Sequence, residues 1–308
     1  MAKSKSFFGL RRGSTKSLTF SIYEGQQVTK DRVTEVKNPR TTTQMRQRMV
    51  MATVLNMYSL GKEIFDHSFE GVTYGAKSMN KFLSENCKLV KASVDAGNTN
   101  FAAVCYGNKA AVPGRYKVSE GTLGSFPAGS QSLIGDGMKV TVTGTSAITV
   151  GALRTQLGLN AGDYFTMITI AYIPNKDYRV GSKGQGASSQ FAFTRVYIPA
   201  GQDDTEITQA NFSTLFETEQ RNSLPLTVTV SETSGTHKLE IIQSPLNYSW
   251  MIASGCVIKS SKQNGVWCRS TEHLLLNAEY WEENVDSADA FTTWPQGASY
   301  VLNGGDVE

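Results

Sequence analysis

Residues that commonly hold metals or activate nucleophiles are scarce in this sequence. Its 308 residues include three histidines, His67, His237 and His273, which lie far apart in different predicted elements. We interpret each as a surface or hydrogen-bonded polar residue. The four cysteines form no Cys-x-x-Cys pair and lack zinc-ligand spacing, so we expect reduced, mostly buried thiols; they are Cys87, Cys105, Cys256 and Cys268. We expect no metal and no cofactor.

Catalytic motifs are lacking as well. Gly181-Ser-Lys-Gly184 has neither the spacing nor the strand–loop–helix context of a phosphate loop. The adjacent acids Asp203-Asp204 and Glu282-Glu283 differ from the opposed carboxylates of a hydrolase, and Trp267-Cys-Arg-Ser270 has no paired base. We therefore predict that the chain is not an enzyme and has no small-molecule substrate. A glycan-directed site built from acidic and aromatic residues of the C-terminal half is the enzyme hypothesis that stays open.

Long apolar runs are absent too. No run approaches the roughly 18 residues that cross a bilayer, so we expect a soluble protein without a membrane partner. Met1-Ala-Lys-Ser4 offers no apolar core of a signal peptide, which predicts synthesis in the cytoplasm.

Positive charge is concentrated near the N-terminus. The formal net charge is +3, but residues 1–49 carry +8 and the remainder −5. Such a segment suits a polyanion or an acidic protein surface. Its eleven cations are the candidate assembly or nucleic-acid contacts: Lys3, Lys5, Arg11, Arg12, Lys16, Lys30, Arg32, Lys37, Arg40, Arg46 and Arg48.

The basic segment begins as an extended arm. Leu18, Phe20 and Ile22 alternate with polar residues, which predicts half-buried strands over 17–23 and 27–30 around a turn at Glu24-Gly25. A two-stranded ribbon is marginal in water, so the arm needs a surface to lie on. We favour a protein assembly arm over a nucleic-acid contact and over plain solvated surface.

Two helices are expected next. Pro39 ends the arm, and a threonine among residues 41–43 caps a helix from Gln44 to about Phe65, with Gly61 as a kink or break. Its apolar stripe contains Met45, Met49, Ala52 and Leu55, broadened by Val50, Val54, Met57 and Ile64. A second helix over 77–89 pairs with it in antiparallel orientation.

The remaining sequence has the pattern of β-strands. Strands are predicted over 138–142, 164–173, 190–198, 226–230, 238–243, 250–259 and 266–270. Both faces of 164–173 are apolar, which indicates a central strand, whereas Leu226, Val228 and Val230 alternate cleanly with polar residues. Short helices are expected over 150–157 and from a Thr208 cap to Phe216.

Three polar segments complete the chain. We interpret the Gly-rich stretches 175–189 and 120–137 as hairpin loops in preference to binding loops. The segment after Asn277 mixes acidic and aromatic residues, which suits either docking onto a surface or an ordinary closing segment.

These features predict an α+β fold: an N-terminal extended arm or hairpin, a helical pair, and then a mainly antiparallel β domain, either a sandwich or an open barrel. The expected parts are the basic arm 1–37, the helical pair 38–97, and the β-rich domain 98–308 with its acidic-aromatic tail.

Several short sequence segments resemble those of a known family. They are Arg12-Gly-Ser-Thr-Lys-Ser-Leu-Thr-Phe20, Lys37-Asn-Pro-Arg-Thr-Thr-Thr-Gln-Met-Arg-Gln-Arg48, Phe69-Glu-Gly71, Ser78-Met-Asn-Lys-Phe-Leu-Ser-Glu-Asn86, Tyr116-Lys-Val-Ser-Glu-Gly-Thr-Leu123 and Trp267-Cys-Arg-Ser270. Their order resembles a family of Bacteroidota and phage proteins that includes virion structural proteins of crAss-like and related tailed bacteriophages. The resemblance is strongest before residue 125 and implies a place in a virus particle.

The resulting hypothesis is a non-enzymatic virion structural protein, in the capsid, neck or tail, that binds copies of itself and other virion proteins. Its expected location is the virion, after synthesis in the host cytoplasm. The alternative is a DNA-binding or packaged accessory virion protein that uses the basic segment, with packaged DNA as its partner.

Overall fold

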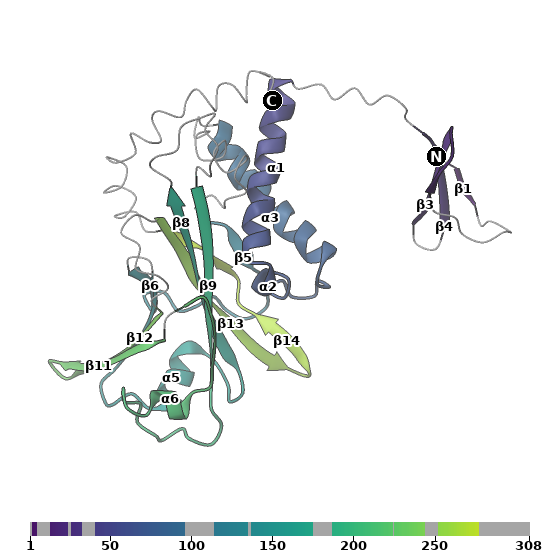
Figure 1. Ribbon diagram of the computed structural model, residues 1–308. Coiled ribbons are helices and arrows are strands. Elements are labelled where there is room, and N and C mark those ends of the chain that lie inside the picture. The colour runs from purple at the N-terminus through teal and green to yellow at the C-terminus, as the bar shows by residue number, and fades with distance from the viewer. Residues whose placement is uncertain are drawn as a thin grey trace. The chain divides into compact units, whose positions relative to one another are not determined.

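A computed structural model describes residues 2–4, 13–23, 26–32, 41–95, 114–134, 137–174, 187–223, 225–243 and 252–276 (Figure 1). Internal contacts divide the chain into two compact units, Met1–Arg40 and Thr41–Glu308. Antiparallel sheets with a few helices make up the described part, which confirms the α+β class. The expected part boundaries at residues 37 and 97, Cys105, the turn at 24–25, loop residues 175–186 and the tail after Asn277 lie outside the described residues.

The first unit is a four-stranded antiparallel sheet in the order β1-β4-β3-β2. Its strands are β1 (Ala2–Ser4), β2 (Gly13–Ser14), β3 (Leu18–Tyr23) and β4 (Gln26–Asp31). Strands β3 and β4 confirm the two predicted strands, and their register pairs Tyr23 with Gln26. The sequence did not predict the flanking strands, because two or three residues are too short to show a period.

The second unit begins with helices α1 (Thr42–Leu60), α2 (Lys62–Phe65) and α3 (Ala76–Asp95). Thr41 caps α1 as predicted, since its hydroxyl accepts a hydrogen bond from the Gln44 N–H at 3.4 Å. Gly61 breaks the helix as predicted; a Cβ there would lie 2.4 Å from the Phe65 ring. Helix α3 runs six residues beyond the predicted end at 89, and buried Val90 continues its apolar face.

Part of the predicted stripe of α1 is wrong. The buried face consists of Met49, Val50, Thr53, Val54, Met57 and Tyr58, whereas Ala52 and Leu55 are only half-buried. The helix is apolar over so much of its circumference that periodicity alone did not fix which side turns inward.

An aromatic cluster joins α1, α2 and α3. The fully buried Phe82 ring lies 5.5 Å from Tyr58, 5.2 Å from Phe65 and 6.3 Å from Phe69, between ring centroids. Further along α3 and nearer the start of α1, Cys87 contacts Met51 with the sulfurs 3.6 Å apart. Because the contacts advance along α3 as they retreat along α1, the predicted antiparallel pairing is confirmed.

The largest sheet has six strands. Its main path is β10 (Thr218–Arg221), β9 (Ala187–Tyr197), β8 (Tyr164–Pro174), β13 (Ile252–Gln263) and β14 (Val266–Arg269), and β16 (Leu275–Leu276) also pairs with β13. The predicted central strand is confirmed, since β8 pairs with β9 and β13 and residues 165–172 are buried. The strand order places β10 and β14 at the two ends of this path.

A second sheet has the order β11-β12-β7-β6. Its strands are β11 (Thr227–Thr233), β12 (Thr236–Gln243), β7 (Gly137–Gly144) and β6 (Gln131–Ile134), and a separate pair joins β5 (Lys117–Ser119) to β15 (Glu272–His273). We predicted that the apolar residues around β11 alternate with polar ones and point into the core, and this is only partly right. Val228 is buried, but Val230 is exposed because the β11–β12 hairpin extends beyond the core.

Two short helices lie at one end of this sheet. Helix α5 (Val150–Leu157) matches its prediction, with Thr149 as N-cap and left-handed Gly158 at its C-terminus. Helix α6 (Phe212–Leu215) is shorter than predicted, and Asn211 is its N-cap. Thr208 instead exchanges hydrogen bonds with Asn211, its N–H donating at 2.8 Å to the side-chain oxygen, which closes a turn before the helix.

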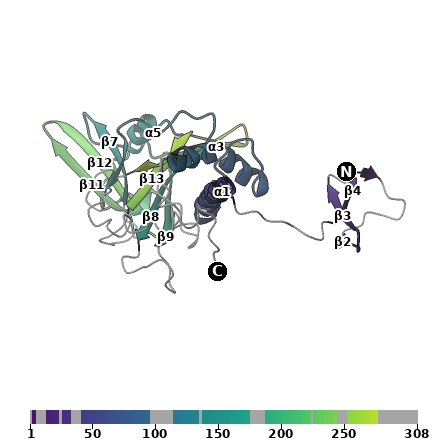
Figure 2. The ribbon, with the colours of Figure 1, turned by 90° about the horizontal axis from the view of Figure 1, so that it is seen from above.

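The six-stranded sheet is covered on both faces. One apolar cluster combines Ile168, Ile170, Phe193 and Cys256 with residues of α1, α2 and α3, and a second combines Phe165, Met167 and Val257 with the inner residues of β7, β12 and α5. Figure 2 shows the helices α1 and α3 on one side of β8 and β9 and the smaller sheet on the other. Strands and helices of the second unit therefore share continuous cores.

Replacing Phe82 with alanine tests the helical layer. We expect Phe82→Ala to lower the free energy of unfolding by about 3–5 kcal/mol, because it removes the ring that contacts four other aromatic side chains. Leu89→Ala on the same helix is the control. Leu89 is 41% exposed, so we expect a change within about 0.5 kcal/mol. Urea unfolding followed by circular dichroism measures both, and equal losses would contradict the packing described.

Candidate functional site

The N-terminal sheet has two chemically different faces. The register places Leu18, Phe20 and Ile22 on one face, all only half-buried. The other face carries the buried Val28 and the exposed Lys30. No helix of the described residues belongs to this unit. The sheet thus combines an incompletely buried apolar face with one that presents an exposed lysine.

The predicted cations are distributed over both units. Lys16, Lys30 and Arg32 are exposed beside the N-terminal sheet, where an Arg32 guanidinium nitrogen donates to the Thr15 carbonyl at 3.2 Å. Arg46 is exposed and Arg48 half-buried on α1. Lys3 lies on β1, but its side chain and all of Lys5, Arg11, Arg12, Lys37 and Arg40 lie outside what the structure describes. The described cations are therefore divided between the two units.

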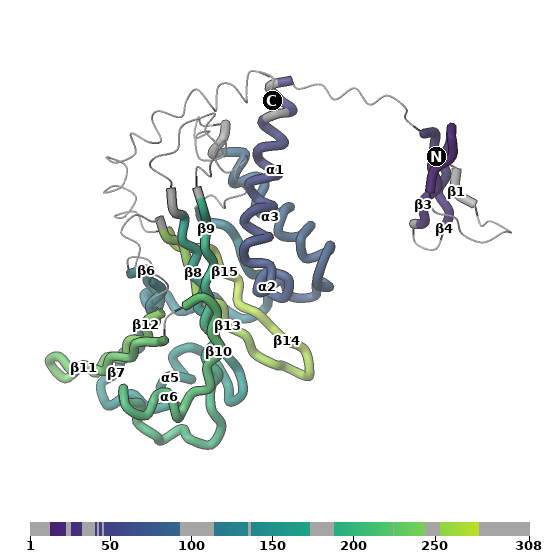
Figure 3. Tube along the Cα trace, viewed as in Figure 1, coloured from purple at the N-terminus to yellow at the C-terminus, as the bar shows by residue number. Residues whose placement is uncertain are grey.

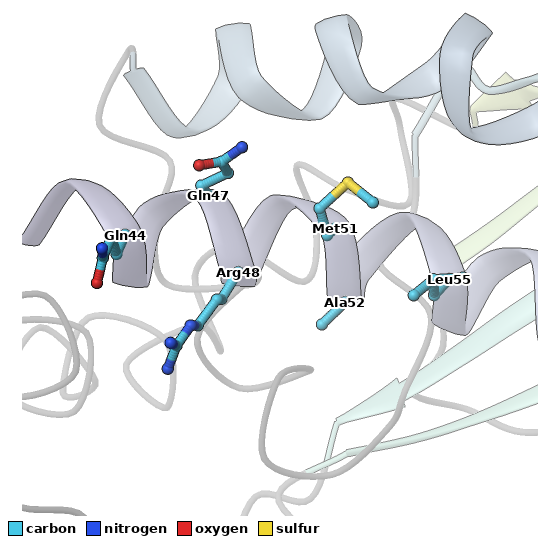
Figure 4. Close-up of a pocket in the computed structure, with 6 residues that line it drawn as sticks. All are labelled: Gln44, Gln47, Arg48, Met51, Ala52 and Leu55. Carbon is cyan, nitrogen blue, oxygen red and sulfur yellow. The ribbon is translucent and has the colours of Figure 1, made fainter. Parts of the chain in front are cut away.

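An open hollow follows one side of α1. Its described lining is Gln44, Gln47, Arg48, Met51, Ala52 and Leu55 (Figure 4). These residues recur every three or four positions, so they form one stripe that is polar near the helix start and apolar further along. The hollow contains no acid–base pair, and we assign no chemistry to it.

The structure reveals a carboxylate linkage that the sequence did not indicate. Glu70 follows the buried Phe69 and accepts hydrogen bonds from the Thr122 N–H at 2.7 Å and the Arg269 N–H at 3.4 Å. Burial opposes ionisation, but these hydrogen bonds lower the pKa of Glu70. Glu70 thus joins the helix connection to two segments that lie 52 and 199 residues further along the chain.

A second unpredicted carboxylate is buried between β15 and the loop before β6. Glu272 is 4% exposed and accepts a hydrogen bond from the Phe126 N–H at 2.6 Å. Burial raises its pKa, although hydrogen bonds from Phe126, Ser270 and Gln131 and the charge of Lys259 act in the opposite direction. Lys259 is also buried, and burial lowers its pKa. Since solvent hardly reaches these groups, we interpret them as structural.

The remaining chemically relevant residues form no catalytic group in the described structure. His67 and His273 are exposed, and His237 lies 4.0 Å from Glu232. Cys256 and Cys268 are buried free thiols, as predicted, and Cys87 is half-buried. Asp203, on the loop before α6, forms an ion pair with Arg154 on α5. Within the residues described, no cluster of three possible metal ligands occurs, and no helix is long and apolar enough to cross a membrane.

Glu272→Gln tests the buried carboxylate. Because the folded-state pKa of Glu272 is raised above the ordinary value of 4.5, its contribution favours the folded state below pH 4.5 and is lost as the pH rises through the raised pKa. We therefore expect the wild type to lose stability relative to Glu272→Gln between pH 4 and the neutral range. Urea titrations of both proteins at several pH values measure this difference. A difference that does not change with pH would contradict the assignment.

Comparisons with known proteins identify no relative: no family model, no curated protein and no solved structure matches the chain.

Proposed function

We propose that the chain is a non-enzymatic structural protein of a bacteriophage virion, a capsid, neck or tail component that assembles through its N-terminal arm and its β domain. Its partners are copies of itself and other virion proteins, and its location is the virion after synthesis in the host cytoplasm. The supporting observation is the N-terminal sheet, a separate compact unit whose apolar face is only half-buried.

The physical argument concerns that apolar face. A sheet gains most of its stability by burying one face against another layer. In this unit Leu18, Phe20 and Ile22 are half-buried, so contact with a second surface would remove further apolar area from water. Symmetric particles repeat one such contact in every subunit, which makes a small, separately folded arm useful for assembly. The phage family resembled in sequence supplies the proposed location.

The finer architecture is also a proposal. We propose that the two larger sheets of the second unit form a sandwich and not an open barrel. Phe165, Met167 and Val257 of one sheet share a core with Val140 and Ile241 of the other. Within the described residues no hydrogen-bonded strand pair closes one sheet onto the other, and β10, β11 and β6 stay at sheet edges. Two facing sheets with separate edges are the arrangement of a sandwich.

The DNA-binding alternative has its own supporting observation, because Lys16, Lys30 and Arg32 are exposed on the same small unit. Contacts of these cations with phosphates would release counterions, so the affinity for DNA would fall steeply with salt. Binding that is absent, or unaffected by salt, would remove this alternative.

Mass photometry of the full-length chain and a variant lacking residues 1–37 tests the assembly proposal. We expect defined oligomers of the full-length chain and monomers of the shortened one. Phe20→Ser should weaken association at least tenfold, because it removes an aromatic ring from the half-buried face. Thr19→Ser, on the opposite face, is the matched control and should leave association unchanged. A full-length chain that stays monomeric and binds no virion component would exclude the proposal.

A further inference from the structure

A cluster of aromatic and arginine side chains spans β9, β8 and β14 at one end of the six-stranded sheet. Tyr164 on β8 is central: its ring lies 5.2 Å from Tyr197 and 5.1 Å from Trp267, between centroids. The guanidinium carbons of Arg195 and Arg269 each lie 5.7 Å from the Tyr164 ring centre. Tyrosine, tryptophan and arginine are the residues enriched at the energetic centres of protein interfaces.

The cluster ends in an exposed hairpin. Trp267 is 39% exposed and Val266 60% exposed, at the start of β14 (Figure 3). Arg269 is almost fully buried, and its side chain donates to the His67 carbonyl at 3.1 Å. Arg269 also lies 5.3 Å from the Trp267 ring, so the tryptophan is held by neighbours before any partner arrives. A preorganised anchor reduces the entropy lost on binding.

The main chain of β14 has an open side at Trp267. The Arg269 N–H donates to Glu70, and the Arg269 carbonyl accepts from the Leu123 N–H at 3.0 Å, so these groups point away from β13. In an antiparallel pair, residues two apart direct their main-chain groups the same way, which places those of Trp267 on the same side. In the described part of the chain, β14 pairs with β13 alone, and no strand covers the outer side of Trp267.

These features favour one kind of ligand. Guanidinium groups lie over the Tyr164 ring, and Arg269 lies beside Trp267, so the ring faces are poorly available to stack a base or a sugar. An open strand edge beside an exposed aromatic anchor suits an extended polypeptide that adds to the sheet. Lys262, paired with Trp267 across the hairpin, is exposed and forms no ion pair among the described residues. A carboxylate on the incoming segment would complement this charge.

We propose that this edge, defined by Tyr164, Lys262, Val266, Trp267 and Arg269, binds the acidic-aromatic segment 277–308 of a second copy of the chain. The sequence of that segment contains seven acids, five aromatic residues and no lysine or arginine. It is therefore complementary to the edge in both charge and side-chain type. The inference deepens the proposed assembly function and rests on it.

We prefer a second copy to the same chain because other residues occupy the sheet edge between Leu276, where the described chain ends, and Trp267. The described chain reaches Leu276 on β16, level with Ser254, whereas Trp267 is level with Lys262 on the same strand β13. The outer side of the intervening residues is already occupied: β5 pairs with β15, and Leu123 bridges Ser270. The positions between Leu276 and Trp267 are therefore filled on this side, whereas the outer side of Trp267 is open to a second copy.

Photo-crosslinking of the full-length chain tests the inference. A benzoylphenylalanine replaces Val266, and copies labelled with heavy isotopes are mixed with light copies before irradiation. We expect mass spectrometry to find crosslinks to residues 277–308 that join heavy and light copies, and an excess of synthetic peptide 277–308 to suppress them. The same crosslinker at Tyr74, which is 70% exposed on another part of the unit, should give no such products.

Two charge reversals make the test specific. Lys262→Glu should reduce the crosslink yield at least fivefold, whereas Lys88→Glu, at an exposed position on α3, should leave it unchanged. Three outcomes would overturn the inference. The crosslinks join residues of a single copy, they reach other segments, or none form at concentrations where oligomers are present. Oligomers that persist without these crosslinks would leave the arm-based assembly proposal intact, so the two proposals fail separately.

Discussion

The second unit depends on the burial of β8 on both faces. An apolar strand with two apolar sides must be covered by two layers, and each covering layer here is itself amphipathic. The helices α1 and α3 bury their apolar side against Ile168 and Ile170, and the smaller sheet buries its inner side against Phe165 and Met167. Residues of β7, β12 and α5 complete the second of these apolar layers, whereas the edge strand β10 is exposed at all four positions.

Polar groups fix how these layers meet. Glu70 ties the helix connection to the segments at Thr122 and Arg269, and Asn86 on α3 exchanges hydrogen bonds with the Lys117 main chain. An ion-pair network of Lys81, Glu85, Lys117 and Glu120 follows the same boundary, with nitrogen–oxygen distances from 2.7 to 3.2 Å. Apolar contacts alone tolerate sliding, whereas directional hydrogen bonds at buried positions specify one arrangement. These contacts therefore define the position of the helices on the sheet.

Both surfaces proposed for assembly leave apolar side chains accessible to a partner. The N-terminal unit keeps apolar residues half-buried, and the β14 edge keeps a tryptophan and a main-chain edge open. Proteins usually protect exposed strand edges with charge, short strands or covering segments. Here the edge presents Trp267 beside the exposed Lys262 and Val266, and the proposed second copy would cover it. Under the two proposals, the N-terminal sheet and the β14 edge would each contact another subunit.

The sequence by itself determined the elements whose signal is local. Period-two alternation predicted β3 and β4, and continuous apolarity predicted the central β8. A threonine among residues 41–43 and Gly61 marked helix ends through capping and steric effects that involve only nearby residues. Tertiary structure alone decided the strand order, the buried side of α1, the exposure of Val230, and the roles of Glu70, Glu272 and the Tyr164 cluster. These depend on partners far along the chain, such as Arg269, 199 residues from Glu70, and Phe126, 146 residues from Glu272. An isolated residue carries no mark of a distant neighbour.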